Sequence, residues 1–586
     1  MSSWDDKEKT ANAVAHSASG SDDYAIREGS AEYTAAEGLN SSTVTYQDAS
    51  GAPVETESPL GYSVDVLVGF CLNINQMVGT GIFSTPATIL KGVGSVGLTM
   101  IYWFLGYLIA QCSQALYLEY TAYFPSRSGS DVVYLEQAFL KPKYLFPTVF
   151  AMKHVIFSFA SSNAIVFAEY VFAIGGISYT NWQLKGVAVA AYTLALIVVA
   201  SNTKWSLRFV VWFGIVKLLT LVLISIAGLV VLGGHTKVAD PMANWRHAWE
   251  GTSNASAYGA TNAMIKLIFS YAGYQNVFGL ANEIKNPVKK LRWSAPLSLI
   301  IVTILYILVN VAYFSAATRE EILASKQIAA SIFFQKVFGT TKAARALSVL
   351  IVISAFGNLI AVMINTSRML RETGRQFWTS TKPFGTPIGP YTVQWALTVI
   401  MIIGPPAGDA FNFGPYHLKN KTPRRARLLT PVIKIVVDLA VYPGNIFNFL
   451  IAVGLILLRQ RRKALNLPPP DFKAWSVAVG FTLLANAYML IAPWYPPIGG
   501  ANGGDVSFWY GTYLAVSIGL LSLCGIYYYF WIDLIPKWKG YEYRQTIVKY
   551  DDGAVTHKMV KIPKADLVSW DQQHDAAGRL RDEVAR

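Results

Sequence analysis

Apolar runs long enough to cross a bilayer recur along most of this chain, and they restrict its fold more than any other feature. A membrane-spanning helix needs about 20 mainly apolar residues, and its backbone must satisfy its hydrogen bonds internally, which favours helices. Nine runs carry no Asp, Glu, Lys or Arg: 66–90, 92–118, 186–203, 293–318, 346–367, 383–408, 439–458, 474–504 and 506–532. Three more are interrupted by isolated charged or titratable residues: 146–174, 209–232 and 258–282. We therefore predict an all-α integral membrane protein with about twelve transmembrane helices.

Composition supports a chain solvated by lipid. Charged residues make up only 14% of the sequence, whereas soluble proteins carry roughly 25%. The net charge of +14 comes from basic residues between the apolar runs, which is typical of membrane-protein loops and predicts no nucleic-acid partner. Cys71, Cys112 and Cys524 lie inside apolar runs and have no metal-ligand spacing, so we expect neither a disulfide framework, nor a bound metal, nor a cofactor.

Basic residues follow the even-numbered runs, as the positive-inside rule requires of cytoplasmic loops. We therefore expect residues 1–61 to be a disordered acidic cytoplasmic tail, 62–535 a transporter domain, and 536–586 a cytoplasmic C-terminal tail. Lys7 and Lys9 are candidate ubiquitination sites in the first tail. Residues 414–434 break the rule, with six Lys and Arg on the predicted outer side; one hypothesis is a retained intron in the gene model.

Glycines inside two apolar runs indicate where a polar solute could bind. The first run contains Gly79-Thr80-Gly81 and the sixth contains Phe269-Ser270-Tyr271-Ala272-Gly273-Tyr274-Gln275-Asn276. Interrupted helices at matching positions of two repeats point to a binding site near the middle of the membrane. Backbone N–H groups at a half-helix start suit a carboxylate, and freed carbonyls suit an ammonium group. Close packing of helices through small residues is the alternative.

Lys217 is a lysine near the middle of its apolar run, where a charge is costly and usually faces the bundle interior. It could join helices with a fixed positive charge, or extend its side chain to an interface. Glu169 suits a structural pairing better than a proton relay, and Lys266 could line a vestibule or extend to an interface. No catalytic triad order, HExxH sequence or phosphate-binding loop is present, so we expect no enzyme.

Four segments together resemble the amino acid–polyamine–organocation superfamily. They are GTGIFSTP (79–86), PSRSGSDVVYLEQAF (125–139), FSYAGYQN (269–276) and NEIKNP (282–287). The sequence is most similar to the L-type amino acid transporter branch, and within it to the fungal high-affinity methionine permeases, which DLAVYPGNIFNF (438–449) also resembles. The resemblance implies a five-plus-five inverted repeat with broken helices 1 and 6, two peripheral helices, and transport by alternating access.

The resemblance also implies roles for individual residues. The substrate carboxylate would meet Gly79, Thr80 and Gly81, and its amino group the carbonyls near Met77, Val78, Phe269 and Ala272. Phe269 would also be an aromatic gate, and Lys217 would bridge helices where sodium-driven relatives bind an ion. The remaining candidates are Gln275, Ser354, Asn358 and Asn445 around the substrate, and a cytoplasmic latch of Arg127 with Glu283. Ala272 and Tyr274 depart from the glycine and tryptophan of many relatives.

These expectations describe a plasma-membrane permease for methionine or another neutral L-amino acid, coupled to protons. No cysteine lies in an expected outer loop, so a disulfide-linked heavy chain is not expected. The first alternative is a transporter-like sensor that binds an amino acid and signals through its tails. An integral-membrane transferase is the second, although the spans offer too few convergent His, Asp or Glu residues for one.

Overall fold

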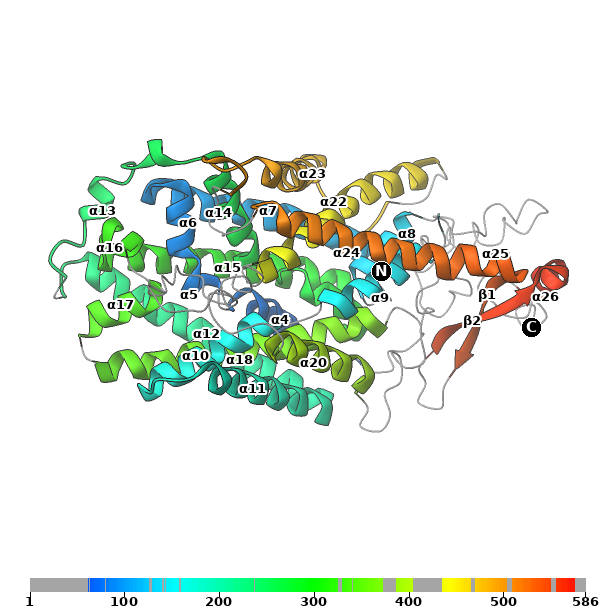
Figure 1. The fold of residues 1–586 in the computed structure, drawn as a ribbon, viewed down its shortest axis with the longest axis horizontal. Helices are drawn as coiled ribbons and strands as arrows, with labels where there is room; N and C mark the ends of the chain where they lie inside the picture. Colours follow the sequence, from blue (N-terminus) through cyan, green and yellow to red (C-terminus); the bar gives the residue numbers. More distant parts are fainter. Residues whose placement is uncertain are drawn as a thin grey trace, which may run out of the picture.

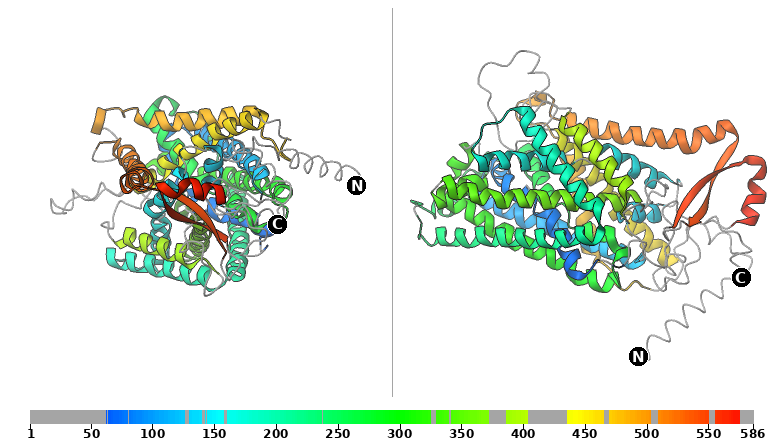
Figure 2. Two further views of the ribbon diagram at one scale, coloured as in Figure 1. Left: turned by 90° about the vertical axis from the view of Figure 1, so that its right-hand side faces the viewer. Right: turned by 90° about the horizontal axis from the view of Figure 1, so that it is seen from below.

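The computed structural model describes residues 62, 64–79, 81–125, 129–139, 142, 144–157, 160–236, 238–324, 329–339, 341–371, 386–403, 435–464, 469–502, 509–549 and 555–574. Long helices run side by side along one axis of the molecule, and a small β-hairpin lies beyond one end of the bundle (Figures 1 and 2). The predicted insert 414–434 lies outside the described residues.

The first five predicted runs fall on helices α4 to α12. The first run is divided into α4 (Val66–Met77), α5 (Gly81–Ser84) and α6 (Pro86–Val93), and the third into α9 (Leu145–Phe157) and α10 (Ser161–Gly175). The other helices of this half are α7 (Val96–Tyr123), α8 (Asp131–Ala138), α11 (Asn181–Ser201) and α12 (Thr203–Leu232). Helix α8 lies between the second and third runs.

The remaining runs fall on helices of the second half. These are α14 (Ala257–Tyr271) followed by the 3₁₀ helix η2 (Asn276–Glu283), α15 (Pro287–Ala316), α18 (Thr341–Arg371), α20 (Ile388–Ile403), α22 (Ile435–Ala464), α23 (Ser476–Ile491) and α24 (Thr512–Tyr528). Short elements connect them at one end: α13 (Ala243–Arg246), η1 (Thr252–Asn254), α16 (Arg319–Ala324), α17 (Ala329–Phe338), η4 (Ala492–Trp494) and η5 (Gly500–Asn502).

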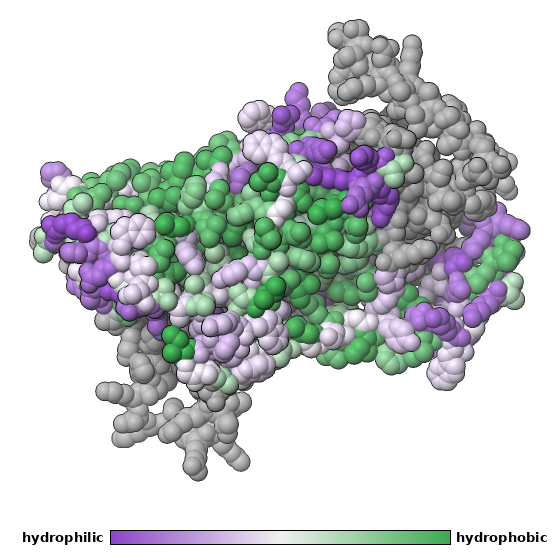
Figure 3. Space-filling model, turned by 90° about the horizontal axis from the view of Figure 1, so that it is seen from above, coloured by the Kyte–Doolittle hydropathy of each residue, from purple (hydrophilic) through white to green (hydrophobic). Residues whose placement is uncertain are grey.

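Nine helices in the described part of the chain are long and apolar enough to cross a membrane. The other three predicted runs fall on the divided pair α9/α10, on α14 and on the 16-residue α20. Hydrophobic side chains form a broad surface between more polar ends (Figure 3). Exposed side chains on α12 include Trp212, Leu219 and Ile226, which would be costly in water and are suited to lipid. The chain is a multi-pass membrane protein.

The divided helices lie where the two halves of the chain pack together. Helix α12 packs against both α4 and α15, α10 packs against α18, and α14 packs against α6. Helix α4 also contacts α18 and η2. The first run is therefore enclosed by four partners from both halves, which places its interruption inside the bundle.

The C-terminal segment contains a hairpin that we did not predict. Helix α24 continues through the π-helix η6 (Tyr529–Leu534) into α25 (Ile535–Lys539), past the predicted end of the transporter domain at 535. Strands β1 (Tyr541–Lys549) and β2 (Val555–Pro563) then pair antiparallel, with Tyr541 opposite Pro563. Helix α26 (Leu567–Gln573) follows after the short turn η7 (Lys564–Asp566), at the far right of Figure 1.

Candidate substrate site between two broken helices

The first break separates α4 from α5. Helix α4 ends at Met77, and Val78 leaves the helical region with φ −79° and ψ 69°. The N–H of Gly79 turns back to the carbonyl of Met77 at 2.8 Å, and α5 begins at Gly81. The predicted interruption of the first run is confirmed. Thr80 lies outside the described residues.

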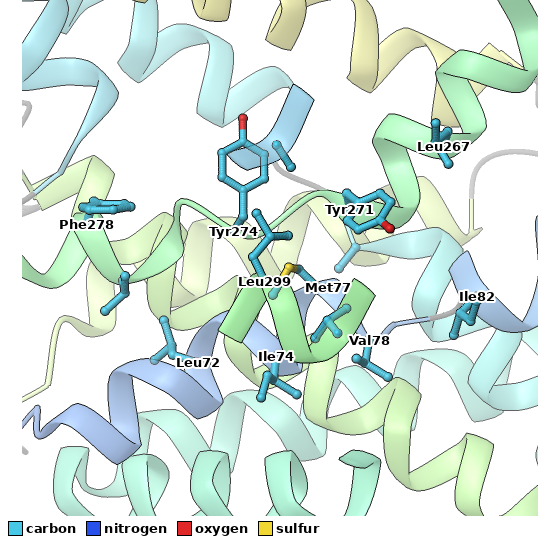
Figure 4. Packing of buried hydrophobic residues seen from close by; sticks show 14 of the residues in the cluster. Leu72, Ile74, Met77, Val78, Ile82, Leu267, Tyr271, Tyr274, Phe278 and Leu299 are labelled. Carbon is cyan, nitrogen blue, oxygen red and sulfur yellow. The ribbon is translucent and has the colours of Figure 1, made fainter. Parts of the chain in front are cut away.

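The second break separates α14 from η2. Helix α14 ends at Tyr271, Ala272 is extended with ψ 134°, and Gly273 has φ +113°, a conformation that L side chains rarely adopt. Figure 4 shows this non-helical stretch between Tyr271 and Phe278, with Met77 and Val78 of the first break beside it. The predicted interruption of the sixth run is therefore also confirmed.

Glycines allow the two breaks to touch. A Cβ atom at Gly273 would lie 2.5 Å from Cβ of Gln76, and one at Gly81 would lie 2.9 Å from Cα of Ser270. Both distances are shorter than real carbon contacts. The side-chain amide of Asn276 donates to Oε1 of Gln76 across the same contact. Close packing through small residues, the alternative to a binding site, is therefore present in the structure. It occurs at the two unwound segments.

Protein groups already bind several carbonyls of the breaks. The hydroxyl of Tyr306, on α15, lies 2.7 Å from the Met77 carbonyl and 3.1 Å from the Ser270 carbonyl, so it bridges both breaks. The Val78 carbonyl accepts from Oγ of Ser354 at 3.0 Å. Each carbonyl oxygen has two lone pairs. The Met77 carbonyl also accepts from the Gly79 N–H, so both of its lone pairs are used, whereas the bonds to the Ser270 and Val78 carbonyls position those oxygens and leave capacity for a second donor.

Lys217 holds the first break from the side of α12. Its side chain is 0% exposed, and Nζ donates to the Asn75 carbonyl at 2.6 Å. The side chain of Asn75 donates in turn to the Val210 carbonyl on α12. The ammonium group is therefore inside the bundle and attached to α4 two residues before that helix ends.

Asn358 joins α18 to the same break. Its Nδ2 donates to the Gln76 carbonyl at 2.7 Å, and its Oδ1 accepts from Asn163 of α10 at 2.7 Å. A Cβ atom at Gly79 would lie 2.8 Å from Nδ2 of Asn358, so the glycine is required for this approach.

Two other predicted residues lie at the second break, and a third lies on a separate helix. Phe269 is half-buried in the last turn of α14, and the half-buried Gln275 has an Oε1 without a hydrogen-bond partner among the described residues. Asn445 is buried on α22. Within the described ranges, no hydrogen bond joins Asn445 to either break.

The sequence-based latch residue Glu283 is paired with a different arginine. Nε of Arg368, on α18, lies 2.7 Å from Oε1 of Glu283 at the end of η2, and Nη2 lies 3.3 Å from Oε2. The side chains are 2% and 1% exposed, and Tyr391 of α20 accepts a third bond from the guanidinium. The predicted partner, Arg127, lies outside the described residues. Arg368 directly follows the charge-free run 346–367, a position that by itself predicts only a basic residue of a cytoplasmic loop.

Two interrupted helices, in contact inside a lipid-exposed helical bundle and held by a buried lysine, define a membrane transporter for a small solute. The amino acid permease family model matches residues 66–520. The chain belongs to this amino acid permease family, whose members carry amino acids across membranes.

Individual relatives fit that assignment. The chain is 34% identical to the high-affinity methionine permease of Saccharomyces cerevisiae over 511 residues, which are 86% of this chain and 84% of the relative. It is 27% identical to the low-affinity methionine permease of the same yeast, over 86% and 89% of the two chains. It is also 28% identical to the b(0,+)-type amino acid transporter 1 of Oryctolagus cuniculus, over 53% of this chain and 63% of the relative.

Proposed function

We propose that this permease imports methionine, or another neutral L-amino acid, across the plasma membrane in symport with protons. The observation that carries the proposal is the contact between the two helix breaks, which brings N–H groups and carbonyls together at one point. Similarity to two methionine permeases supports the choice of substrate.

In this proposal the substrate carboxylate binds the N–H groups of Gly79, Thr80 and Gly81, at the positive end of the half-helix that starts there. The N–H of Gly79 must then turn away from the Met77 carbonyl, to which it donates in the structure. The amino group binds carbonyls near Met77, Val78, Phe269 and Ala272. Gln275, Asn358 and Asn445 contribute to the pocket for the side chain, with Phe269 as a gate. A zwitterion satisfies both kinds of backbone group at once.

Lys217 takes the place of a coupling cation. Its bond to the Asn75 carbonyl, buried from solvent, links α12 to the first break with a fixed positive charge. A bound sodium ion at this position would be repelled, so transport is expected to proceed without sodium.

In this proposal, opening toward the cytoplasm requires η2, which ends the sixth run, to move away from α18. The pair of Glu283 with Arg368 ties these elements together, so we propose that it separates during each cycle. Arg127, from the connection between the second and third runs, is a second candidate partner for Glu283 in another state. Both chain termini are placed in the cytoplasm, with Lys7 and Lys9 as ubiquitination sites that control abundance, and no disulfide-linked heavy chain is required.

Uptake of radiolabelled methionine in yeast lacking its own methionine permeases tests the proposal. Faster uptake at acid than at neutral pH, competed mainly by unlabelled methionine, is expected. Absence of uptake of any amino acid, with the protein present at the cell surface, would favour the alternative of an amino acid sensor that signals through its tails.

A further inference from the structure

A polar cluster outside the substrate site brings together side chains of four helices, α7, α8, α9 and α22, beside η2. Asp131 is the first residue of α8, and the hydroxyl of Tyr117 from α7 donates to its Oδ1. The same hydroxyl lies 3.3 Å from Oδ1 of Asn448 on α22. Lys153 of α9 attracts the Asp131 carboxylate electrostatically. Asp131 and Lys153 are both half-buried.

This cluster can satisfy its hydrogen bonds with or without a proton on Asp131. When the carboxyl is ionised, the Tyr117 hydroxyl donates to it. When the carboxyl is protonated, it can donate to the tyrosyl oxygen, and the tyrosyl proton can turn to Oδ1 of Asn448, which is already in reach. A buried site that is satisfied in both states avoids the penalty of an unpaired polar group in either.

The cluster is mechanically connected to the substrate site. The N–H of Gly129, two residues before Asp131, donates to the carbonyl of Gly279 in η2 at 3.0 Å. The Tyr117 ring packs on Phe278 at 5.8 Å and on Tyr274 at 6.4 Å between centroids. Tyr274 directly follows Gly273 of the second break. Movement of this break and of η2 must therefore displace the Tyr117 side chain.

The charges around Asp131 allow it to change its protonation state. Partial burial raises the pKa of the Asp131 carboxyl, while the Tyr117 hydrogen bond and Lys153 oppose that rise. Among the residues that the structure describes, Tyr134 of α8 and Tyr274 also interact electrostatically with Asp131. Arg461 of α22 donates to the carbonyls of Gln137 and Ala138 at the opposite end of α8.

The neighbouring carboxylate Glu119 is already bound by several donors. Arg459 donates to both of its oxygens, at 2.8 and 2.5 Å. The hydroxyl of Tyr123 and the N–H of Ala474 complete its shell. Four donors therefore hold the Glu119 carboxylate, which joins α7 to α22 through Arg459.

We propose that Asp131 binds and releases the proton that is co-transported with the amino acid. The inference rests on the proton symport proposed above and names the group that performs it. Only the O–H bond on the carboxyl forms and breaks in each cycle: the proton comes from water and returns to water. Movement of the second break and η2 changes the contact of Tyr117 with Asp131. This change links substrate movement to proton binding.

The test uses the purified full-length protein in liposomes. Labelled methionine is added outside, and a pH-sensitive dye is enclosed in the liposomes. For Asp131→Asn we expect uptake driven by a proton gradient to fall at least about tenfold and dye acidification to disappear. Exchange of labelled for unlabelled methionine, which needs no net proton movement, should stay within about twofold of the unmodified protein. Glu320→Gln, which neutralises an exposed carboxylate on α16, should change neither assay.

A second variant separates proton binding from structure. Tyr117→Phe removes the donor that stabilises the anion, so the pH at which gradient-driven uptake is half-maximal should move toward neutral. Retained acidification in Asp131→Asn, or loss of exchange together with uptake, would overturn the inference. If the unmodified protein transports methionine without acidification, the proposed proton symport itself fails, and the Asp131 inference fails with it.

Discussion

Lys217 donates from the middle of α12 to the backbone carbonyl of Asn75 at 2.6 Å, two residues before α4 ends. The Lys217 amino group thus lies beside the unwound segment between α4 and α5. The bond ties α12 to the break of the first run.

Replacing Lys217 should remove this tie. In Lys217→Ala the buried Asn75 carbonyl loses the shorter of its two side-chain donors and keeps only Nδ2 of Asn358 at 3.3 Å. A poorly satisfied buried carbonyl costs up to about 1–3 kcal/mol, and we expect methionine uptake to fall at least about tenfold. Lys204→Ala on the same helix, which removes an exposed lysine, should leave uptake unchanged. Uptake by the unmodified protein should be the same in sodium and choline buffers; a requirement for sodium would contradict the role of Lys217.

Adding one methyl group at Gly273 should separate the two breaks. The residue has φ +113°, and its Cβ atom would lie 2.5 Å from Gln76; backbone strain alone costs about 1–3 kcal/mol. We expect Gly273→Ala to reach the membrane but to lose uptake at least about tenfold. Gly186→Ala, whose new Cβ has no neighbour within 4 Å, is the matched control. Equal uptake by both variants would argue against a substrate site at this contact.

Neutralising one partner of the buried ion pair should shift the equilibrium between transporter states. Glu283→Gln leaves Arg368 buried without its counterion, at a cost of about 3–5 kcal/mol to any state in which the two remain buried together. We expect faster labelling of a cysteine at position 272 from the cytoplasmic face, in a background lacking Cys71, Cys112 and Cys524.

Two further variants make this labelling experiment decisive. The double variant Glu283→Gln with Arg368→Gln should return labelling toward the original rate, because no lone charge is then buried. Asp240→Asn breaks an exposed ion pair with Arg246 and should have no effect. Unchanged labelling in Glu283→Gln would show that the pair does not restrict access.

Removing the Tyr306 hydroxyl should loosen both breaks together. This hydroxyl lies between the carbonyls of Met77 and Ser270, and a buried hydrogen bond contributes about 0.5–1.5 kcal/mol. We expect Tyr306→Phe to raise the KM for methionine by about threefold to tenfold with normal surface expression. Tyr313→Phe, a buried tyrosine seven residues further along α15, is the control; equal effects would indicate general packing.

Local sequence patterns predicted the helices and the helix breaks, because these depend mainly on residues that are neighbours in the sequence. Runs without charge located the helices, and Gly79, Gly81 and Gly273 located the breaks, because lipid and backbone geometry constrain each segment by itself. The pairing of Glu283 with Arg368 was missed because it joins positions 85 residues apart, and no periodicity reports such a distance. The choice of Arg127 used only its expected side of the membrane.

The C-terminal hairpin was missed for a different reason. Alternating residues in Tyr541–Lys549 and Val555–Pro563 flank Asp552-Gly553, a turn sequence typical of hairpins. This pattern was available, but the charge of the segment was interpreted as a solvated tail. Tyr306 and Tyr117 lie inside apolar helices, where only the packed structure shows which tyrosine meets a broken helix.

The central claim is that the two breaks bind the carboxylate and the ammonium group of one amino acid. Competition for labelled methionine uptake in liposomes, with analogues that lack one of these groups, tests it most directly. The account predicts that 3-(methylthio)propylamine and 3-(methylthio)propionate need concentrations roughly 10-fold to 150-fold higher than unlabelled methionine for the same inhibition, because losing a charge-assisted contact costs about 1.5–3 kcal/mol. Competition by either analogue as strong as that by methionine would contradict a site built for both charges.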